Sequence, residues 1–182
     1  MRSAIARGLA LGAVVLLMGQ SAQAQLLEKK ALSLEAARKM VAAAAAEAER
    51  NHWRGVVAVV YDGGWVILLE RMDHAAMTAS VELAPGEARS VALVKKPTQE
   101  LGEAINHSRY AAITARGFVE MQGGLPVVVD GEVIGAIGAS FPTPEEGKQV
   151  AKAGWPGSVS DRSHCISQPF SADSRRPNTA IC

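Results

Sequence analysis

Four consecutive side chains, Arg71, Met72, Asp73 and His74, are the first candidates for ligand chemistry in this chain. They follow a predicted strand, and loops that leave strands commonly carry binding residues. Imidazole is the commonest protein ligand of metals, so His74 is the predicted metal ligand. The alternative interpretation is an exposed loop histidine, with Arg71 in a salt bridge to Glu70 or Asp73.

Gly123 and Gly124 form a second candidate binding site. Paired glycines can expose successive backbone N–H groups in a concave turn, and such a turn binds anions. A plain turn before a hairpin explains the same two residues equally well, so both interpretations stay open.

No catalytic residue is predicted. The chain has no Ser-His-Asp order with supporting motifs, no Walker loop and no zinc-ligand spacing. Glu145 and Glu146 favour the start of a helix and do not suggest an acid–base pair. Among the other histidines, we expect His52 to cap a helix end, His107 to lie on the surface and His164 to fall in an irregular tail.

Two predicted β-hairpins position the candidate residues. The first joins residues 56–61 to residues 65–71 through an Asp-Gly-Gly turn. The second runs over 123–140 and turns at Asp130-Gly131, because a type I′ turn needs positive φ at both central residues. Glycines in its second strand indicate that either a helix backbone or a ligand approaches closely.

Helices are predicted at both ends of the folded part. Ser33 is the expected N-cap of a first helix that ends near Arg50. Thr143 is the expected N-cap of a last helix that has Pro144 in its first turn and ends near Gly154.

The middle of the chain is expected to supply two more helices and a short strand. Residues 79–96 have helical composition, and either a kinked helix spans Pro85 or the helix starts there. Thr98 is expected to cap a further helix through roughly Ser108, and residues 118–121 suggest a strand. The sequence therefore predicts an α+β fold with a five-stranded, mostly antiparallel sheet flanked by helices.

The first 24 residues are predicted to be a signal peptide. Arg2 and Arg7 precede an apolar stretch of about ten residues, too short to cross a bilayer, and Ala22-Gln23-Ala24 is a cleavage sequence. We expect an exported protein, periplasmic or secreted, with no membrane span after cleavage.

Residues 25–157 are predicted to form one domain, followed by an irregular or disordered tail over 158–182. Cys165 and Cys182 both lie in this tail. An oxidising compartment permits a disulfide between them, and the alternative is that the two thiols never meet.

The composition argues against a nucleic-acid partner. The chain has 19 basic and 18 acidic residues, and removal of Arg2 and Arg7 with the signal peptide leaves one more acidic than basic residue. Such a balance creates no strong field for an anionic polymer. Only 4% of residues are aromatic, too few to suggest a stacking surface for single strands.

Five segments, in this order, resemble the GlcG/HbpS family, which also includes the C-terminal domain of PduO-type proteins. No single segment is specific, but the whole series is, and it covers about residues 32–154. The segments are LSLEAARKMV (32–41), VVAVVYDGGWVILLERMD (56–73), ELAPGEARSVAL with KKPT after it (82–98), GFVEMQGGLPVVVDGEVIGAIGAS (117–140) and TPEEGKQVAKAG (143–154).

This resemblance implies a compact α+β domain close to the profilin-like architecture, assembled into homo-oligomers. It implies haem binding for the better-understood members, corrinoid-linked roles for the PduO-like ones and accessory roles beside catabolic operons for others. If haem binds here, His74 is the expected axial ligand and Arg71 the expected partner of a propionate. In such a family, the members share the fold more reliably than they share the ligand.

The chain departs from the family pattern at three places. Phe141 stands where a Gly usually follows the last strand, and Gly147 and Lys148 stand where an acidic pair is common. His74 follows Arg-Met-Asp where a Gly is frequent. We expect these changes to cluster at the rim of a pocket. This chain would then differ from the other family members in the ligand that it binds.

The favoured hypothesis is an exported, non-catalytic protein that binds haem or another tetrapyrrole. The alternative is a small-molecule-binding accessory protein of a catabolic pathway without a metal cofactor. A third hypothesis is a catalyst of haem breakdown or of another small-substrate reaction.

Overall fold

The fold is an α+β structure built on four antiparallel strands. It comes from a computed structural model that describes residues 28–159. The main sheet has the order β2-β1-β4-β3, and β5 adds two residues parallel to β3 at its edge. The strands are β1 (Val56–Tyr61), β2 (Val66–Arg71), β3 (Gly124–Val129), β4 (Glu132–Ser140) and β5 (Ser158–Val159). The predicted α+β class and the mostly antiparallel order are confirmed.

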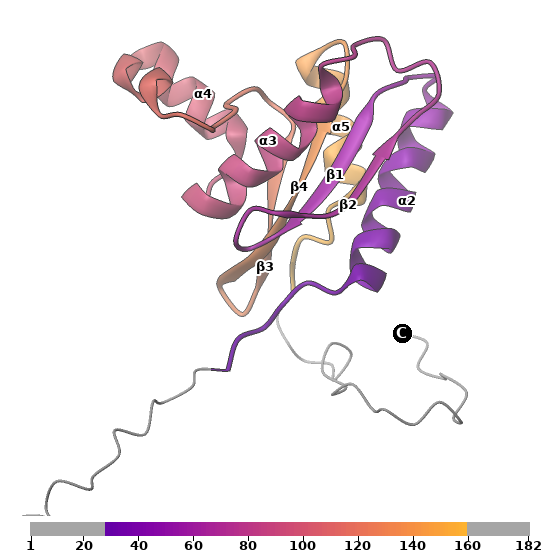
Figure 1. Cartoon of the computed structure of the whole chain (residues 1–182), viewed down its shortest axis with the longest axis horizontal. Coiled ribbons are helices and arrows are strands. Elements are labelled where there is room, and N and C mark those ends of the chain that lie inside the picture. Colours follow the sequence, from indigo (N-terminus) through magenta and orange to yellow (C-terminus); the bar gives the residue numbers. More distant parts are fainter. Residues whose placement is uncertain (1–27, 160–182) are drawn as a thin grey trace, which may run out of the picture.

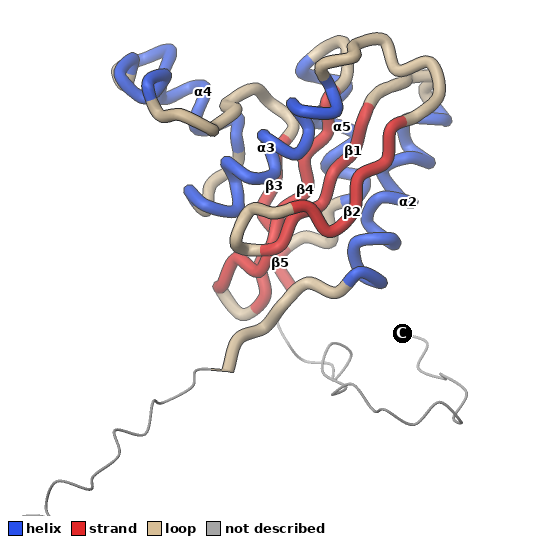
Figure 2. The backbone as a smooth tube through the Cα atoms, viewed as in Figure 1, coloured by secondary structure: helices blue, strands red, loops and turns tan. Residues whose placement is uncertain are grey.

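Helices cover both faces of the sheet. The helices of the part of the chain that the structure describes are α2 (Leu34–Arg50), α3 (Ser80–Val94), α4 (Thr98–His107), α5 (Pro144–Gly154) and the short 3-10 helix η1 (Tyr110–Thr114). Helices α2 and α5 pack together on one face, and α3 lies across the other (Figure 1). The strands, drawn in red in Figure 2, therefore form the middle layer.

Strand β1 lies at the centre of the core. Val57 and Val59 pack toward α2 and α5, whereas Val56, Ala58 and Val60 face α3. All five side chains are fully buried. An unbroken apolar run is what a strand covered on both faces requires, and it explains why this segment does not alternate with polar residues.

The terminal helices begin where their capping residues predict. The Ser33 Oγ accepts a hydrogen bond from the Ala36 amide at 3.1 Å, and the Thr143 Oγ1 accepts one from the Glu146 amide at 3.3 Å. Helix α3 begins at Ser80 and runs through Pro85, so one helix spans this proline and does not start there.

The prediction that Thr98 caps a helix is wrong. The residue before α4 is Pro97, which makes no side-chain cap hydrogen bond. The Thr98 hydroxyl instead accepts a hydrogen bond from the Gly124 amide. The side chain is fully buried and faces the sheet, so it is not available to the start of its own helix.

The second hairpin has the predicted turn and the predicted close neighbour. Asp130 and Gly131 have φ values of 50° and 82°, as a type I′ turn requires. A Cβ atom at Gly138 would overlap the carbonyl oxygen of Ala84 and lie 2.8 Å from the amide nitrogen of Ala88. The backbone that approaches this strand closely is therefore that of α3.

Residues 118–121 are not a strand, contrary to the prediction. The Val119 amide donates its hydrogen bond to the Ser90 Oγ of α3 at 2.7 Å, so this backbone is bound to a helix side chain and not to a neighbouring strand. Ser158 and Val159, placed in the irregular tail by the sequence, pair with β3. The predicted signal peptide, Cys165 and Cys182 lie outside the described residues.

Helix α4 and η1 form an arm that stands off from the sheet (Figures 1 and 2). The only buried residue of α4 is Thr98, and η1 buries none. We call residues 98–120, which include both helices, the α4 arm. Within residues 28–159, no helix has the length and apolar character needed to cross a bilayer.

Candidate functional site

The predicted loop at residues 71–74 is only partly available to a ligand. Met72 is 9% exposed and belongs to the core, and its amide donates to the Gly55 carbonyl at 3.0 Å. Arg71, Asp73 and His74 are exposed, and His74 has a φ of 61°. Arg71 forms no ion pair with a described residue, and its Nη1 donates to the Met72 carbonyl at 3.4 Å.

The amide of Gly124 is not free to bind an anion. It donates to the Thr98 Oγ1 at 2.9 Å, and the Gly123 carbonyl accepts from the Ala139 amide at 3.0 Å. Beside this turn lies a pocket of about 30 Å³, which Lys148 also lines. This volume is about that of one water molecule, so the pocket does not hold an organic ligand.

The structure does not bring the two predicted sites together. Arg71 at the end of β2 and Gly124 at the start of β3 lie at the same end of the sheet. The order β2-β1-β4-β3 separates them by three strand spacings, or roughly 14 Å. A ligand bound at one of these positions therefore does not depend on the other.

The three departures from the family pattern do not share one rim. Phe141 is 5% exposed and packs in the core, where its ring contacts the position of Gly55. Gly147 packs against the carbonyl oxygen of Ala139, and Lys148 lines the small pocket beside Gly123. His74 lies on a different loop, so the expectation that these residues cluster is wrong.

A buried carboxyl group lies beneath the Gly123 turn and was not found from the sequence. Glu87 on α3 is 2% exposed, and its Oε2 has no hydrogen-bond partner among the described residues. Burial raises the pKa of Glu87 to about 9, and a hydrogen bond with the backbone of Ala139 partly opposes this. At neutral pH this side chain is a neutral acid. Its spacing from Ala84 and Val91 places it on the buried face of α3, which is the signal that could have revealed it.

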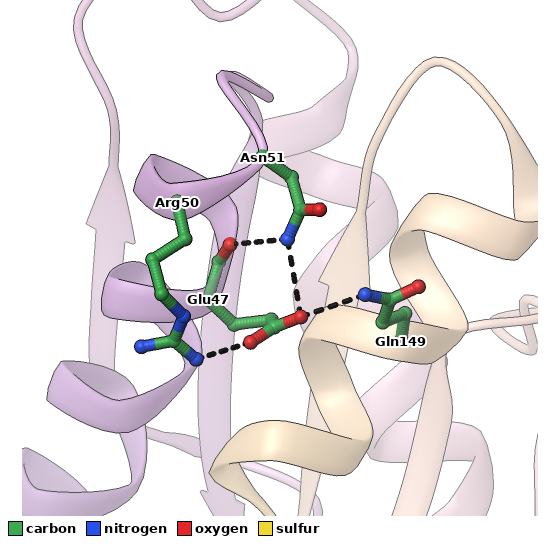
Figure 3. Close-up of polar contacts among 4 residues, drawn as sticks. All are labelled: Glu47, Arg50, Asn51 and Gln149. Atoms are coloured by element: carbon green, nitrogen blue, oxygen red, sulfur yellow. Dashed lines mark hydrogen bonds and ion pairs between the residues drawn. The ribbon is translucent and has the colours of Figure 1, made fainter.

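The polar cluster that joins the end of α2 to the middle of α5 has a structural role. Figure 3 shows Glu47 of α2 joined to Arg50, Asn51 and Gln149, the last of which belongs to α5. The bond from Gln149 is the main reason that the pKa of Glu47 lies below its ordinary value of 4.5, and the bond from Arg50 adds to it. These contacts fasten the two helices that cover one face of the sheet.

A groove of about 210 Å³ lies where the end of α3 meets the α4 arm. Six of its eight lining residues are apolar, and Arg109 and Glu120 are charged. The lining residues are Val94, Leu101, Ala104, Arg109, Ala112, Ala115, Phe118 and Glu120. Arg109 forms no ion pair with a described residue. An apolar groove with a few charged groups is the usual form of a small-molecule site.

Three exposed apolar side chains are close in sequence to residues that line this groove. Tyr110 is 64% exposed, Ile113 71% and Met121 51%. Large exposed apolar side chains in one stretch of chain are candidates for a binding surface. Sequence reasoning missed the site because its walls come from segments that only the fold brings together.

The four histidines have different surroundings. His52 follows α2 with a φ of 59°, and its amide donates to the Glu49 carbonyl at 3.0 Å, so it ends the helix through its backbone. His107 is exposed, as expected, and its Nδ1 lies 2.8 Å from the Glu103 carbonyl oxygen. His164 is outside the described residues.

Within residues 28–159, no cluster of three or more His, Cys, Asp or Glu side chains could hold a metal ion.

Comparisons with known proteins identify relatives over most of the described region. The profile of the family described as "Haem degrading protein HbpS-like" matches residues 32–155. Protein GlcG of Escherichia coli K12 is 41% identical over 112 residues, which are 62% of this chain and 83% of the relative.

Solved structures show the same arrangement. A crystal structure of an HbpS double mutant from Streptomyces reticuli superposes with a TM-score of 0.68 at 29% identity, covering 74% of this chain and 92% of that one. A structure described as a PduOC:heme complex superposes with a TM-score of 0.63 at 26% identity, covering 68% of this chain and 92% of that one.

Proposed function

The chain belongs to the HbpS-like family, and from this premise we propose that it is an exported, non-catalytic protein that binds haem or a related tetrapyrrole. The resemblance found in the sequence is confirmed by the family match. What carries the ligand proposal is the combination of a haem-related family with an apolar, cation-bearing groove in this chain.

The residues of the α4 arm fit a tetrapyrrole chemically. A porphyrin has an apolar edge and, on the opposite side, two carboxylate groups. The six apolar lining residues suit the edge, and the Arg109 guanidinium suits a carboxylate. Bound haem would supply a redox-active iron, and the residues of this chain would bind and orient the macrocycle.

We propose binding without turnover as the role of the groove. Its charged lining groups are a guanidinium and a carboxylate, and none of the lining side chains is a hydroxyl, thiol or imidazole. This set favours holding a ligand over attacking it. The experiment is to add a reductant to the haem-loaded protein and follow the spectrum over hours. An unchanged haem spectrum supports binding, and loss of the haem bands supports the catalytic hypothesis.

Export, homo-oligomer formation and the profilin-like architecture complete the proposal. The predicted signal peptide over residues 1–24 supports export to the periplasm or beyond. Exposed Tyr110 and Ile113 on the arm, with Met121 directly after it, would suit contact between copies. Native mass spectrometry of protein purified from the host reports the amino terminus, the assembly state and any ligand that co-purifies.

The decisive experiment is a titration of the purified mature protein with ferric haem. The expected result is a saturable shift of the Soret band at micromolar haem with a defined stoichiometry. A spectrum that remains the sum of free haem and protein up to tens of micromolar would rule the proposal out.

A second candidate function is binding of a small apolar molecule without a metal. The observation that favours it is the volume of about 210 Å³, which suits a ligand smaller than a porphyrin. If this candidate is correct, haem leaves the Soret band unshifted, and native mass spectrometry finds a lighter organic ligand.

A further inference from the structure

The size of the groove at the α4 arm suits a small molecule. Its volume of about 210 Å³ is below the roughly 300–1,000 Å³ of pockets that bury most of a drug-sized ligand. A dry apolar cavity of about 150 Å³ in another protein holds one benzene ring. The groove therefore has room for one ring or one branched chain, with a little space left for a polar head.

The walls of the groove require that the body of the ligand is apolar. They come from the end of α3, from α4, from η1 and from the chain that follows η1, and the larger of these side chains are Val94, Leu101 and Phe118. Val94 is 39% exposed, so the groove is open to water at this wall. A ligand can therefore bury an apolar group between these segments and keep its polar head at the surface.

Two opposite charges complete the lining. Arg109 and Glu120 both line the groove, and neither forms an ion pair with a described residue. The backbone of each is held against α4: the Arg109 amide donates to the Ala104 carbonyl at 2.8 Å, and a Cβ atom at Gly102 would lie 3.0 Å from the Glu120 carbonyl oxygen. The lining thus presents one cation and one anion that do not neutralise each other.

These two charges select the head group of the ligand. A guanidinium binds a carboxylate, often through two parallel hydrogen bonds, and a carboxylate accepts hydrogen bonds from an ammonium group. A simple carboxylic acid would satisfy Arg109 but would bring a second negative charge close to Glu120, and like charges repel. A zwitterion, which carries both charges and no net charge, suits both residues.

We propose that the groove binds a free amino acid with an apolar side chain of the size of phenylalanine or leucine. The side chain of the ligand fills the apolar part, its carboxylate pairs with Arg109 and its ammonium group pairs with Glu120. This inference rests on the second candidate function, binding of a small molecule without a metal, and names the chemical class of that molecule. The amino acid and haem would compete for the same groove.

The test is isothermal titration calorimetry of the purified mature protein with L-phenylalanine and with two analogues that each lack one charge. Phenethylamine lacks the carboxylate, and 3-phenylpropionate lacks the ammonium group. We expect L-phenylalanine to bind at one site per chain with a dissociation constant of about 1 mM or lower, and each analogue to bind at least tenfold more weakly. Equal binding of all three compounds would overturn the proposal, because the groove would then recognise only the ring.

Two charge variants test the assigned contacts. Arg109→Gln should lose the preference for L-phenylalanine over phenethylamine, and Glu120→Gln should lose the preference over 3-phenylpropionate. A merely structural role of either residue would weaken all three compounds alike. Arg116→Gln and Glu103→Gln are the matched controls: both residues are exposed charges of the α4 arm outside the lining, so both variants should bind as the unmodified protein does.

The outcomes separate this inference from the candidate functions. If L-phenylalanine and L-leucine give no heat but native mass spectrometry finds another small ligand, the second candidate function stands and the amino acid is the wrong class. If the amino acids give no heat and Ala104→Trp abolishes haem binding, the groove belongs to haem. If L-phenylalanine binds equally well to Ala104→Trp, its site lies elsewhere and the inference is overturned. If neither haem nor any small molecule binds, the inference and both candidate functions fail together.

Discussion

The hydroxyl of Thr98 accepts a hydrogen bond from the backbone amide of Gly124, with 2.9 Å between Oγ1 and N. Thr98 begins the α4 arm, and Gly124 begins strand β3. The threonine side chain is fully buried, so the two groups meet away from water. A single side-chain oxygen thus satisfies the amide of a strand and fixes the arm to the sheet.

Replacing Thr98 by Val should destabilise the protein by about 1–3 kcal/mol, because the change keeps the shape and leaves the Gly124 N–H buried without an acceptor. Urea denaturation followed by circular dichroism measures the free energy of unfolding. Thr98→Ser keeps the acceptor and should retain most of this stability. Equal midpoints for the Val variant and the unmodified protein would mean that the bond contributes nothing.

Replacing Gly138 by Ala should destabilise the protein by about 3 kcal/mol or more, because the added methyl group meets the backbone of α3, which cannot rotate away as a side chain does. Gly117→Ala is the control: nothing lies within 4 Å of its Cβ, and its φ of 83° alone costs about 1–2 kcal/mol. The comparison is a thermal melt of both variants. A smaller loss for Gly138→Ala than for Gly117→Ala would contradict the close approach of α3 to β4.

Glu87 should make the protein less stable as the pH rises. Its pKa is raised from 4.5 to about 9 by burial, so the folded state keeps a proton that the unfolded state releases between these values. The free energy of unfolding should therefore fall by about 1.4 kcal/mol per pH unit across this window. Below pH 4.5 both states are protonated, and the effect is absent.

Replacing Glu87 by Gln should remove that slope, so that the variant gains about 3 kcal/mol over the unmodified protein between pH 4.5 and pH 7. Urea midpoints at half-unit steps from pH 4.5 to pH 8 give the measurement. Glu82→Gln, an exposed change on the same helix, should leave the slope intact. An unchanged slope in Glu87→Gln would show that the carboxyl group is ionised in the folded state.

Replacing Ala104 by Trp should fill the groove and weaken haem binding at least tenfold, because an indole occupies the space that an edge of the ligand needs. Asn106→Trp places the same side chain on an exposed position of α4 outside the lining and should bind haem as the unmodified protein does. Fluorescence quenching by haem gives both affinities. Equal affinity in the two variants would place the ligand elsewhere.

Local rules account for the part of the fold that the sequence predicts well. The Asp130-Gly131 turn, the Ser33 cap and the Thr143 cap each depend on a few neighbouring residues and on the backbone geometry that those residues favour. The two hairpins followed from the same rules, and so did the mostly antiparallel order of the sheet.

Features that depend on distant segments were missed. Thr98 has the composition of an N-cap, yet its hydroxyl bonds to Gly124, 26 residues away. Residues 118–121 have strand composition, yet the Val119 amide bonds to Ser90 of α3. The groove in the α4 arm depends on how α4, η1 and the chain after them meet, which no local pattern encodes.

The α4 arm is held to the rest of the protein by few buried residues, so its local stability should be lower than that of the sheet. Because Thr98 is the one buried residue of α4 and η1 buries none, the arm can open while the sheet stays intact. Its amide protons should exchange with deuterium far sooner than those of β1 and β4. A bound ligand would slow that exchange selectively, which makes the arm a built-in reporter of occupancy.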